Sequence, residues 1–228
     1  MPFVFSPSNM QSFRDCPLRF WGQSISKEIK WKASQQKSRG QVLHSNIQKC
    51  LQQGWQDAIS WDAQVDVDYV RNRVAEVRAA MASGASCYIE HELVVTKRGG
   101  KTGWWDDDAV LRARADAFVI PPDAASPAVL IDIKSGKKWD SDDFQLRVEC
   151  FLVHLLYSRP VVRYEYWYAD IGETVDGLID FRNGLAPVQD ILDCMQTMGL
   201  PIKNNDFTPT PNKFCRWCDF NNTPKCMR

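Results

Sequence analysis

The chain has 228 residues, with 28 basic and 28 acidic side chains and hence no formal net charge. Its hydrophobic content of 44% excludes a disordered polypeptide, and its length is sufficient for one domain with a sizeable core. Because the overall charge is neutral, any affinity for a polyanion must come from local basic patches.

The first ten residues, MPFVFSPSNM, contain no basic segment ahead of an apolar one, and therefore do not resemble a signal peptide. The longest apolar run, at 150–157, is too short to span a bilayer, so no membrane association is expected. Without an export signal, the eight cysteines are interpreted as reduced thiols and metal ligands instead of disulfides. These features predict a cytoplasmic location.

The first third of the chain has helical periodicity. Ser8 and Gln11 resemble a capping box that begins a short helix through NMQSFRDC. A second helix is predicted from about Arg39 to Leu51, and a third over 66–82, because their apolar residues recur at helical spacing.

The apolar period then changes to two, which indicates strands. The remaining elements are predicted as strands at 88–95, 110–120 and 128–134, a helix at 141–158, a strand at 161–170 and a helix at 185–198. The tail from Gly199 has no periodicity. This order predicts an α/β fold with a mixed central sheet flanked by helices.

Charged side chains interrupt the apolar strand AVLIDIK. Asp132 and Lys134 share one face of that strand, and Asp116 lies on the strand before the turn. Two neighbouring carboxylates repel each other unless a cation lies between them, and a hard divalent metal prefers such ligands. Lys134 would then orient or deprotonate a water, or stabilise charge on a phosphate. The structural alternative is a partly exposed ion pair at a strand end.

Three further polar residues are candidates for the same site. His44 follows Gly40 by one helical turn and is either a metal ligand or a core histidine. Gln145, near the start of the predicted helix 141–158, either contacts the substrate backbone or is solvated. Glu92 is a possible additional carboxylate, although an exposed strand charge would explain it equally well.

Four of the cysteines form a pattern. Cys215, Cys218 and Cys226 lie in the aperiodic tail, and Cys16 lies near the other end of the chain. A C-x-x-C pair sets two thiolates at one metal centre, so the four predict a clasp between the chain ends, with zinc as the generic metal. The others are interpreted as packing thiols: Cys50, Cys87, Cys150 and Cys194.

Taken in order, these segments resemble the PD-(D/E)XK nuclease superfamily in its RecB-like branch, and more narrowly its iron–sulfur exonucleases, which include CRISPR-associated and phage-encoded types. The segments that carry the resemblance are FSPSNMQSFRDCPLRF, GQVLH with Gly40 and His44, ARAD with Asp116, DIK with Asp132 and Lys134, QLRVE with Gln145, and the cysteines. Two positions depart from the family pattern. Ala113 replaces a glycine, and Glu149 replaces a tyrosine of the Gln-helix.

The resemblance implies a metal-dependent exonuclease that degrades or trims single-stranded DNA ends. A 4Fe-4S cluster on Cys16, Cys215, Cys218 and Cys226 is implied in preference to zinc. His44, Asp116, Asp132 and the carbonyl of Ile133 would hold one or two divalent cations, and Mn²⁺ should fit at least as well as Mg²⁺. One nuclease domain is expected over 1–228, with 1–37 and 199–228 as the metal-cluster margin and 38–198 as the helical segment and catalytic core.

The expected partners are single-stranded DNA and other DNA-processing proteins. Tryptophans lie in or near three basic stretches, which suits unstacked bases and their phosphates. The stretches are 26–32, 97–101 and 134–138, and the aromatics are Trp31, Trp104, Trp105 and Trp139. Two alternatives stay open: a non-catalytic or partner-dependent DNA-binding adaptor, and a zinc-clasped domain of unrelated chemistry.

Overall fold

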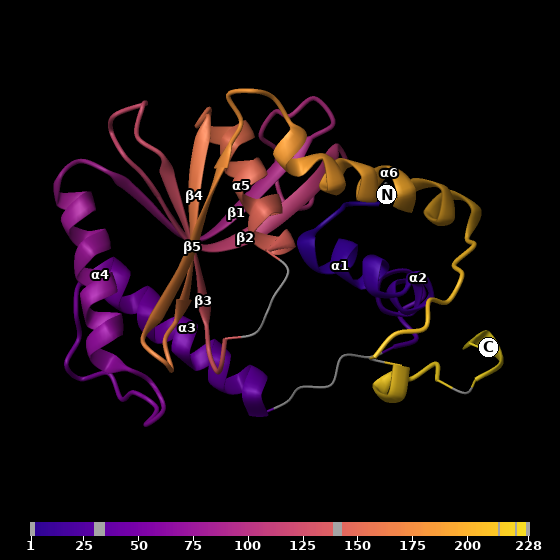
Figure 1. Ribbon diagram of the computed structural model, residues 1–228, viewed down its shortest axis with the longest axis horizontal. Helices are drawn as coiled ribbons and strands as arrows, with labels where there is room; N and C mark the ends of the chain where they lie inside the picture. The colour runs from indigo at the N-terminus through magenta and orange to yellow at the C-terminus, as the bar shows by residue number, and fades with distance from the viewer. Residues whose placement is uncertain (1–2, 30–34, 139–142, 214, 222, 227–228) are drawn as a thin grey trace.

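The computed structural model describes residues 3–29, 35–138, 143–213, 215–221 and 223–226. One five-stranded sheet lies at its centre, with the strands in sequence order (Figure 1). The strands are β1 (Ser86–Thr96), β2 (Ala109–Ile120), β3 (Ala128–Lys134), β4 (Val161–Tyr168) and β5 (Glu173–Asp180). The helices and helical turns are α1 (Pro7–Asp15), α2 (Pro17–Phe20), η1 (Trp21–Ile25), α3 (Gln35–Gln53), α4 (Val67–Ala82), α5 (Phe144–Tyr157), η2 (Ala186–Val188), α6 (Gln189–Asn204), η3 (Cys215–Trp217) and η4 (Pro224–Cys226).

The sheet is mixed. β1, β2 and β3 are antiparallel neighbours, β3 and β4 are parallel, and β5 returns antiparallel to β4. A parallel pair needs a crossover, and α5 supplies it between β3 and β4. The expected α/β architecture, a mixed sheet flanked by helices, is therefore confirmed.

Helices cover both faces of the sheet (Figure 1). Leu130 of β3 packs in the core that α1, α5 and α6 form on one face. Ile131, the next residue, packs with α3 and α4 on the other face. The alternation of side chains along a strand thus gives this chain two cores with one sheet between them.

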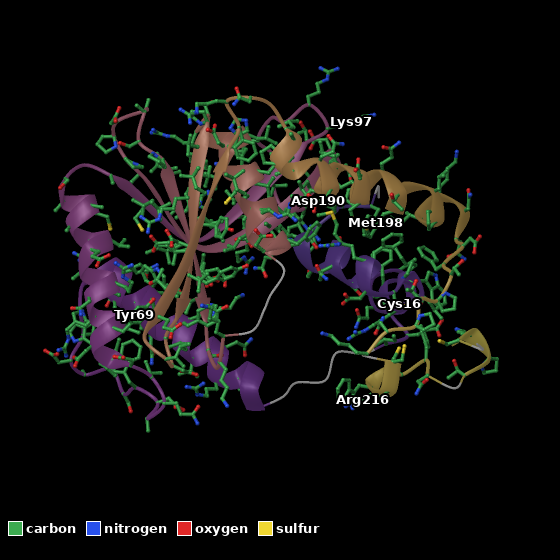
Figure 2. All side chains as sticks on the ribbon, in the orientation of Figure 1. Cys16, Tyr69, Lys97, Asp190, Met198 and Arg216 are labelled. Atoms are coloured by element: carbon green, nitrogen blue, oxygen red, sulfur yellow. The ribbon has the colours of Figure 1, made fainter. Side chains whose placement is uncertain are left out.

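The two ends of the chain meet in a third, smaller cluster. Its buried members are Cys16, Leu18, Ile29 and Phe220. Figure 2 shows Cys16 and Arg216 in the same part of the molecule, where α2 and the C-terminal tail lie. The amide of Asn212 also donates a 2.7 Å hydrogen bond to the carbonyl of Asp15, which ties the tail to the end of α1.

Two predicted helices differ from the structure. The first helix begins at Pro7, because Ser6 and not Ser8 is the N-cap, and Asn9 completes the capping box. The last helix continues to Asn204 in spite of Pro201, since Ile202 packs against the core. Residues 139–142, which include the start of the predicted helix 141–158, lie outside the described residues.

The sequence prediction missed β5 altogether. This edge strand is mostly polar, and its apolar Leu178 is 57% exposed. Only Val175 and Ile179, on the opposite face, pack in the core, so the apolar alternation in the sequence is weak. Its pairing with β4 runs through eight consecutive residue pairs, from Val161–Asp180 to Tyr168–Glu173. Backbone pairing with β4 therefore makes this segment a strand. Apolar periodicity in the sequence does not reveal such pairing.

No helix within the described residues combines the length and the apolar composition that crossing a membrane requires.

Truncating one leucine of the sheet tests the two-core packing. Leu130 is fully buried, so Leu130→Ala should lower the free energy of unfolding by about 2–5 kcal/mol. Leu178→Ala is the matched control, and its exposed side chain should change that energy by about 0.5 kcal/mol or less. Urea denaturation of both variants measures the difference. Equal losses would contradict the assigned packing of β3 and β5.

Candidate metal centre

Three carboxyl groups form one row across neighbouring strands. In the register of β1 and β2, where Ile89 pairs with Ala117 and His91 with Ala115, Glu90 lies opposite Asp116. The β2–β3 register pairs Ala117 with Ile131, so Asp132 follows on the other side of Asp116. Three like charges side by side repel one another unless positive charge lies among them.

The backbone is distorted where this row crosses β1 and β2. Glu90 has a left-handed conformation (φ 48°), which is strained for a residue with a side chain. On β2, Ala115 packs in the α5 core, whereas Ala117 packs in the α3 core, so the alternation changes at Asp116. This change lets a strand residue lie next to a side chain of α3.

His44 of α3 is that side chain. Its Nδ1 lies 3.2 Å from Oδ1 of Asp116, while Oδ2 of Asp116 accepts a 2.8 Å hydrogen bond from the Ile133 amide. Burial opposes the charge on His44, but Asp116, Asp132 and the backbone of Ile133 outweigh it and raise the pKa of the imidazole. Asp116 of β2 is therefore held from two directions, by His44 of α3 and by the backbone of β3.

Ligand atoms of His44, Glu90 and Asp116 all lie within 4.8 Å of one another. Two carboxylates and one imidazole are a donor set that suits Mg²⁺ or Mn²⁺. Burial, followed by the charge of Asp116, raises the pKa of Glu90. A divalent cation among these atoms would offset that repulsion, so the three residues fit a metal ion.

Asp132 and Lys134 lie beside this group. The Asp132 side chain is 5% exposed, and its Oδ2 is 2.6 Å from Nζ of Lys134. Lys134 is therefore the positive charge that faces this oxygen. Burial raises the pKa of Asp132 to about 6 in spite of the ammonium beside it.

Lys134 carries its charge in this arrangement. Burial disfavours the ammonium, but Asp132 and then Asp116 outweigh that effect, so the pKa of Lys134 lies above its ordinary value. Its Nζ also lies 5.6 Å from the ring centre of Tyr166, the residue opposite Asp132 on β4. A lysine that stays protonated can orient a water or stabilise an anion, and it is a poor base.

Gln145 connects Asp132 to a second buried carboxyl group. Its Nε2 donates to Oδ1 of Asp132 at 3.3 Å and to Oε1 of Glu149 at 3.0 Å. Burial, and then the charge of Asp132, raises the pKa of Glu149 well above its usual range. Glu149, at the position where the family pattern has a tyrosine, therefore accepts a hydrogen bond from the amide of Gln145 and fixes that amide beside Asp132.

The structure places five of the expected side chains close together: His44, Asp116, Asp132, Lys134 and Gln145. Ile133 was expected to offer its carbonyl to a metal, and its backbone amide donates to Asp116. The sequence analysis missed Glu90 and considered Glu92 instead. Glu92 is an exposed strand charge that pairs with Arg114 at 2.7 Å. The signal for Glu90 was its position opposite Asp116, which becomes visible only once the strand register is known.

The four patterned cysteines also converge. Cys16, Cys215, Cys218 and Cys226 line one cavity of about 190 Å³ between the chain ends. Backbone amides donate to two of the sulfurs: Thr210 to Cys16 at 3.4 Å and Asn212 to Cys215 at 3.2 Å. Such hydrogen bonds stabilise thiolates that bind a metal or a cluster.

The other cysteines lie outside this cavity. Cys50, Cys150 and Cys194 are buried among apolar residues, whereas Cys87 is half-buried. Burial raises the pKa of Cys87 and of Cys194 to about 11. These thiols are therefore uncharged at neutral pH and pack as small apolar groups.

A sequence model described as the PD-(D/E)XK nuclease superfamily matches residues 4–223. Thirteen chains of solved structures are similar to the fold. One of them, titled "Crystal structure of SSO0001", has a TM-score of 0.46 and 15% identity, over 100% of this chain and 89% of that one. A search of curated proteins finds no significant match.

Removing one carboxylate charge tests the metal centre. Glu90→Gln should weaken Mn²⁺ binding by about tenfold or more, because it removes a charged ligand next to Asp116. Glu92→Gln makes the same change two residues away, in a side chain paired with Arg114, and should leave the affinity unchanged. Calorimetric titration with Mn²⁺ compares the two. Equal affinities in both variants would remove Glu90 from the site.

Proposed function

Because the chain belongs to the PD-(D/E)XK nuclease superfamily, we propose that it is a metal-dependent deoxyribonuclease that shortens single-stranded DNA from its ends. The observation that carries this proposal is the cluster of His44, Glu90 and Asp116 next to the Asp132–Lys134 pair. A row of desolvated carboxylates, with an imidazole on one side and an ammonium on the other, is suited to hydrolysis of a phosphodiester.

Each residue has a distinct part in the proposed reaction. A bound Mg²⁺ or Mn²⁺ would supply a water of lowered pKa and would neutralise the scissile phosphate. His44, Glu90 and Asp116 are its ligands, and Asp132 completes the negative pocket. The charged Lys134 orients the attacking water and stabilises the charge that develops on the phosphate. Gln145, fixed by Glu149, contacts the DNA backbone.

We further propose that the clasp formed by 1–37 and 199–228 holds a 4Fe-4S cluster, with 38–198 as the catalytic part of a single domain. The shared cavity of the four cysteines and the amide hydrogen bonds to their sulfurs support a metal group. A single tetrahedral zinc requires sulfurs about 3.8 Å apart. Within the described residues, no three cysteine sulfurs lie within 4.8 Å of one another, which favours a larger cluster.

Single-stranded DNA is proposed as substrate because an exposed indole lies beside guanidinium groups. Trp105 is 81% exposed, and Arg112 lies 5.2 Å from its ring centre and 4.5 Å from that of Trp104. Both tryptophans line a cleft of about 540 Å³ that also contains Lys27. Unstacked bases bind to such surfaces. Trp31 and Trp139 lie outside the described residues.

Lys134→Ala tests the catalytic assignment. It should slow cleavage of end-labelled linear single-stranded DNA by about 10²-fold or more, because no ammonium would remain to stabilise the phosphate. Lys49→Ala removes an exposed lysine of α3 that lies outside the three basic stretches, and should cut at the wild-type rate. Cleavage assays in Mn²⁺ compare the rates.

A circular single strand of the same sequence separates end-trimming from internal cutting in that assay. Survival of the circle supports an exonuclease, and its cleavage would establish an endonuclease instead. If wild type binds DNA but cuts neither form, a non-catalytic adaptor role replaces the proposal. Wild-type rates in Lys134→Ala would overturn the assigned site.

Cys16→Ser tests the cluster. It should lower the iron content of anaerobically purified protein severalfold, because one of the four proposed ligands is lost. Cys50→Ser alters a fully buried thiol outside the cavity and should retain the wild-type content. Elemental analysis of iron and zinc measures the outcome. One zinc per chain without iron would contradict the iron–sulfur assignment.

A further inference from the structure

Helix α3, which carries His44, contacts the segment after β3, which carries Lys134, at a point away from the metal ligands. Gly40 of α3 faces the segment that follows β3, and a Cβ on Gly40 would lie 3.4 Å from Oγ of Ser135. The adjacent Gly136 has a φ of 92°, a conformation that favours glycine. This close approach brings α3 within reach of the turn between β4 and β5.

Asp170 of that turn makes contacts in two directions. Its two carboxylate oxygens accept hydrogen bonds from Arg39 at 2.7 and 2.6 Å, in a bidentate pair. Its Oδ2 also accepts a hydrogen bond from the backbone amide of Gly136. The neighbouring Ala169 amide donates to the carbonyl of Lys134 at 3.1 Å. The turn between β4 and β5 thus contacts both α3 and the end of β3.

The two partners of Asp170 lie close in the sequence to residues of the metal centre. Arg39 precedes His44 by five residues on α3, and Gly136 follows Lys134 by two. The side chain of Asp170 is 7% exposed, and bidentate pairs between arginine and a carboxylate are strong and geometrically specific. The carboxylates of Asp170 and Asp62 raise the pKa of Arg39 further above its usual range, so the pair is charged at every physiological pH.

We propose that Asp170 is a positioning residue for the metal centre, acting through Arg39 on His44 and through Gly136 on Lys134. The inference rests on the proposed function, since it concerns the same metal site. Without the pair, α3 loses its bidentate link to the turn that also binds Gly136, and His44 gains freedom to move relative to Asp116. Loss of such a supporting contact commonly weakens metal binding by about 10–100-fold.

Metal binding without DNA is the appropriate measurement, because it does not depend on turnover. Mn²⁺ is titrated by calorimetry into the full-length wild type, Asp170→Asn and Arg39→Lys. Asp170→Asn removes the charge and leaves the shape. Arg39→Lys keeps the charge and removes the two-pronged donor geometry. Both should raise the Kd for Mn²⁺ by about tenfold or more.

Asp190→Asn is the matched control. Asp190 of α6 also forms a bidentate pair, with Arg147 at 2.8 and 2.7 Å, on the α5 side of the sheet (Figure 2). Asp190→Asn should bind Mn²⁺ with the wild-type Kd, even if the substitution lowers the melting temperature. A general loss of stability would affect the control as well, whereas a positioning effect is confined to the Asp170–Arg39 pair.

The outcomes separate this inference from the function on which it rests. If wild type binds Mn²⁺ and both Asp170→Asn and Arg39→Lys bind it equally well, Asp170 is only a structural residue and the inference is wrong. If Asp170→Asn fails to fold, weakened binding by a folded Arg39→Lys still supports the inference, and unchanged binding overturns it. If wild type itself neither binds Mn²⁺ nor cuts DNA, the proposed function fails first.

Discussion

The repulsion among three carboxyl groups on neighbouring strands is the constraint on which the site depends. Glu90, Asp116 and Asp132 lie in one row, and burial makes the charges of Glu90 and Asp132 costly. The chain offsets this cost with His44 from α3 and with Lys134 from the same strand as Asp132. Lys134 is on β3 itself, whereas His44 comes from α3, so the α3 layer must be in place before the row is fully compensated.

The packing of α1 against α5 connects the metal centre with the cysteine cavity. Met10 and Phe13 of α1 are buried in the core with α5, and the guanidinium of Arg14 lies 4.2 Å from the ring centre of Phe144. Gln145 follows Phe144, while Cys16 is the C-cap of α1. The nine-residue helix α1 therefore lies between the cysteine cavity and the first turn of α5. Binding a metal group at the clasp would stabilise this arrangement by holding both ends of the chain together.

Most of the site could be predicted from local sequence because its residues lie at fixed spacings within single elements. The Asp132–Lys134 pair follows from the period of a strand, and Gly40 and His44 follow from one turn of a helix. Glu90 could not be predicted in this way. Glu90 and Glu92 both fit an alternating strand, and only pairing with β2 distinguishes the residue beside Asp116 from the one beside Arg114. Asp170 likewise carries no local signal, since its partners are 131 and 34 residues away.

The sequence by itself determined the types of chemical group that this protein uses and the elements that carry them, because side-chain chemistry and hydrophobic period are local properties. It also predicted that four cysteines near the two ends would converge, and in the structure they line one cavity. The tertiary structure decided which carboxylates meet, which lysine stays charged, and which turn holds the histidine helix against the strand. Those outcomes depend on strand register, on burial and on contacts between distant segments, and none of these is a property of a single stretch of chain.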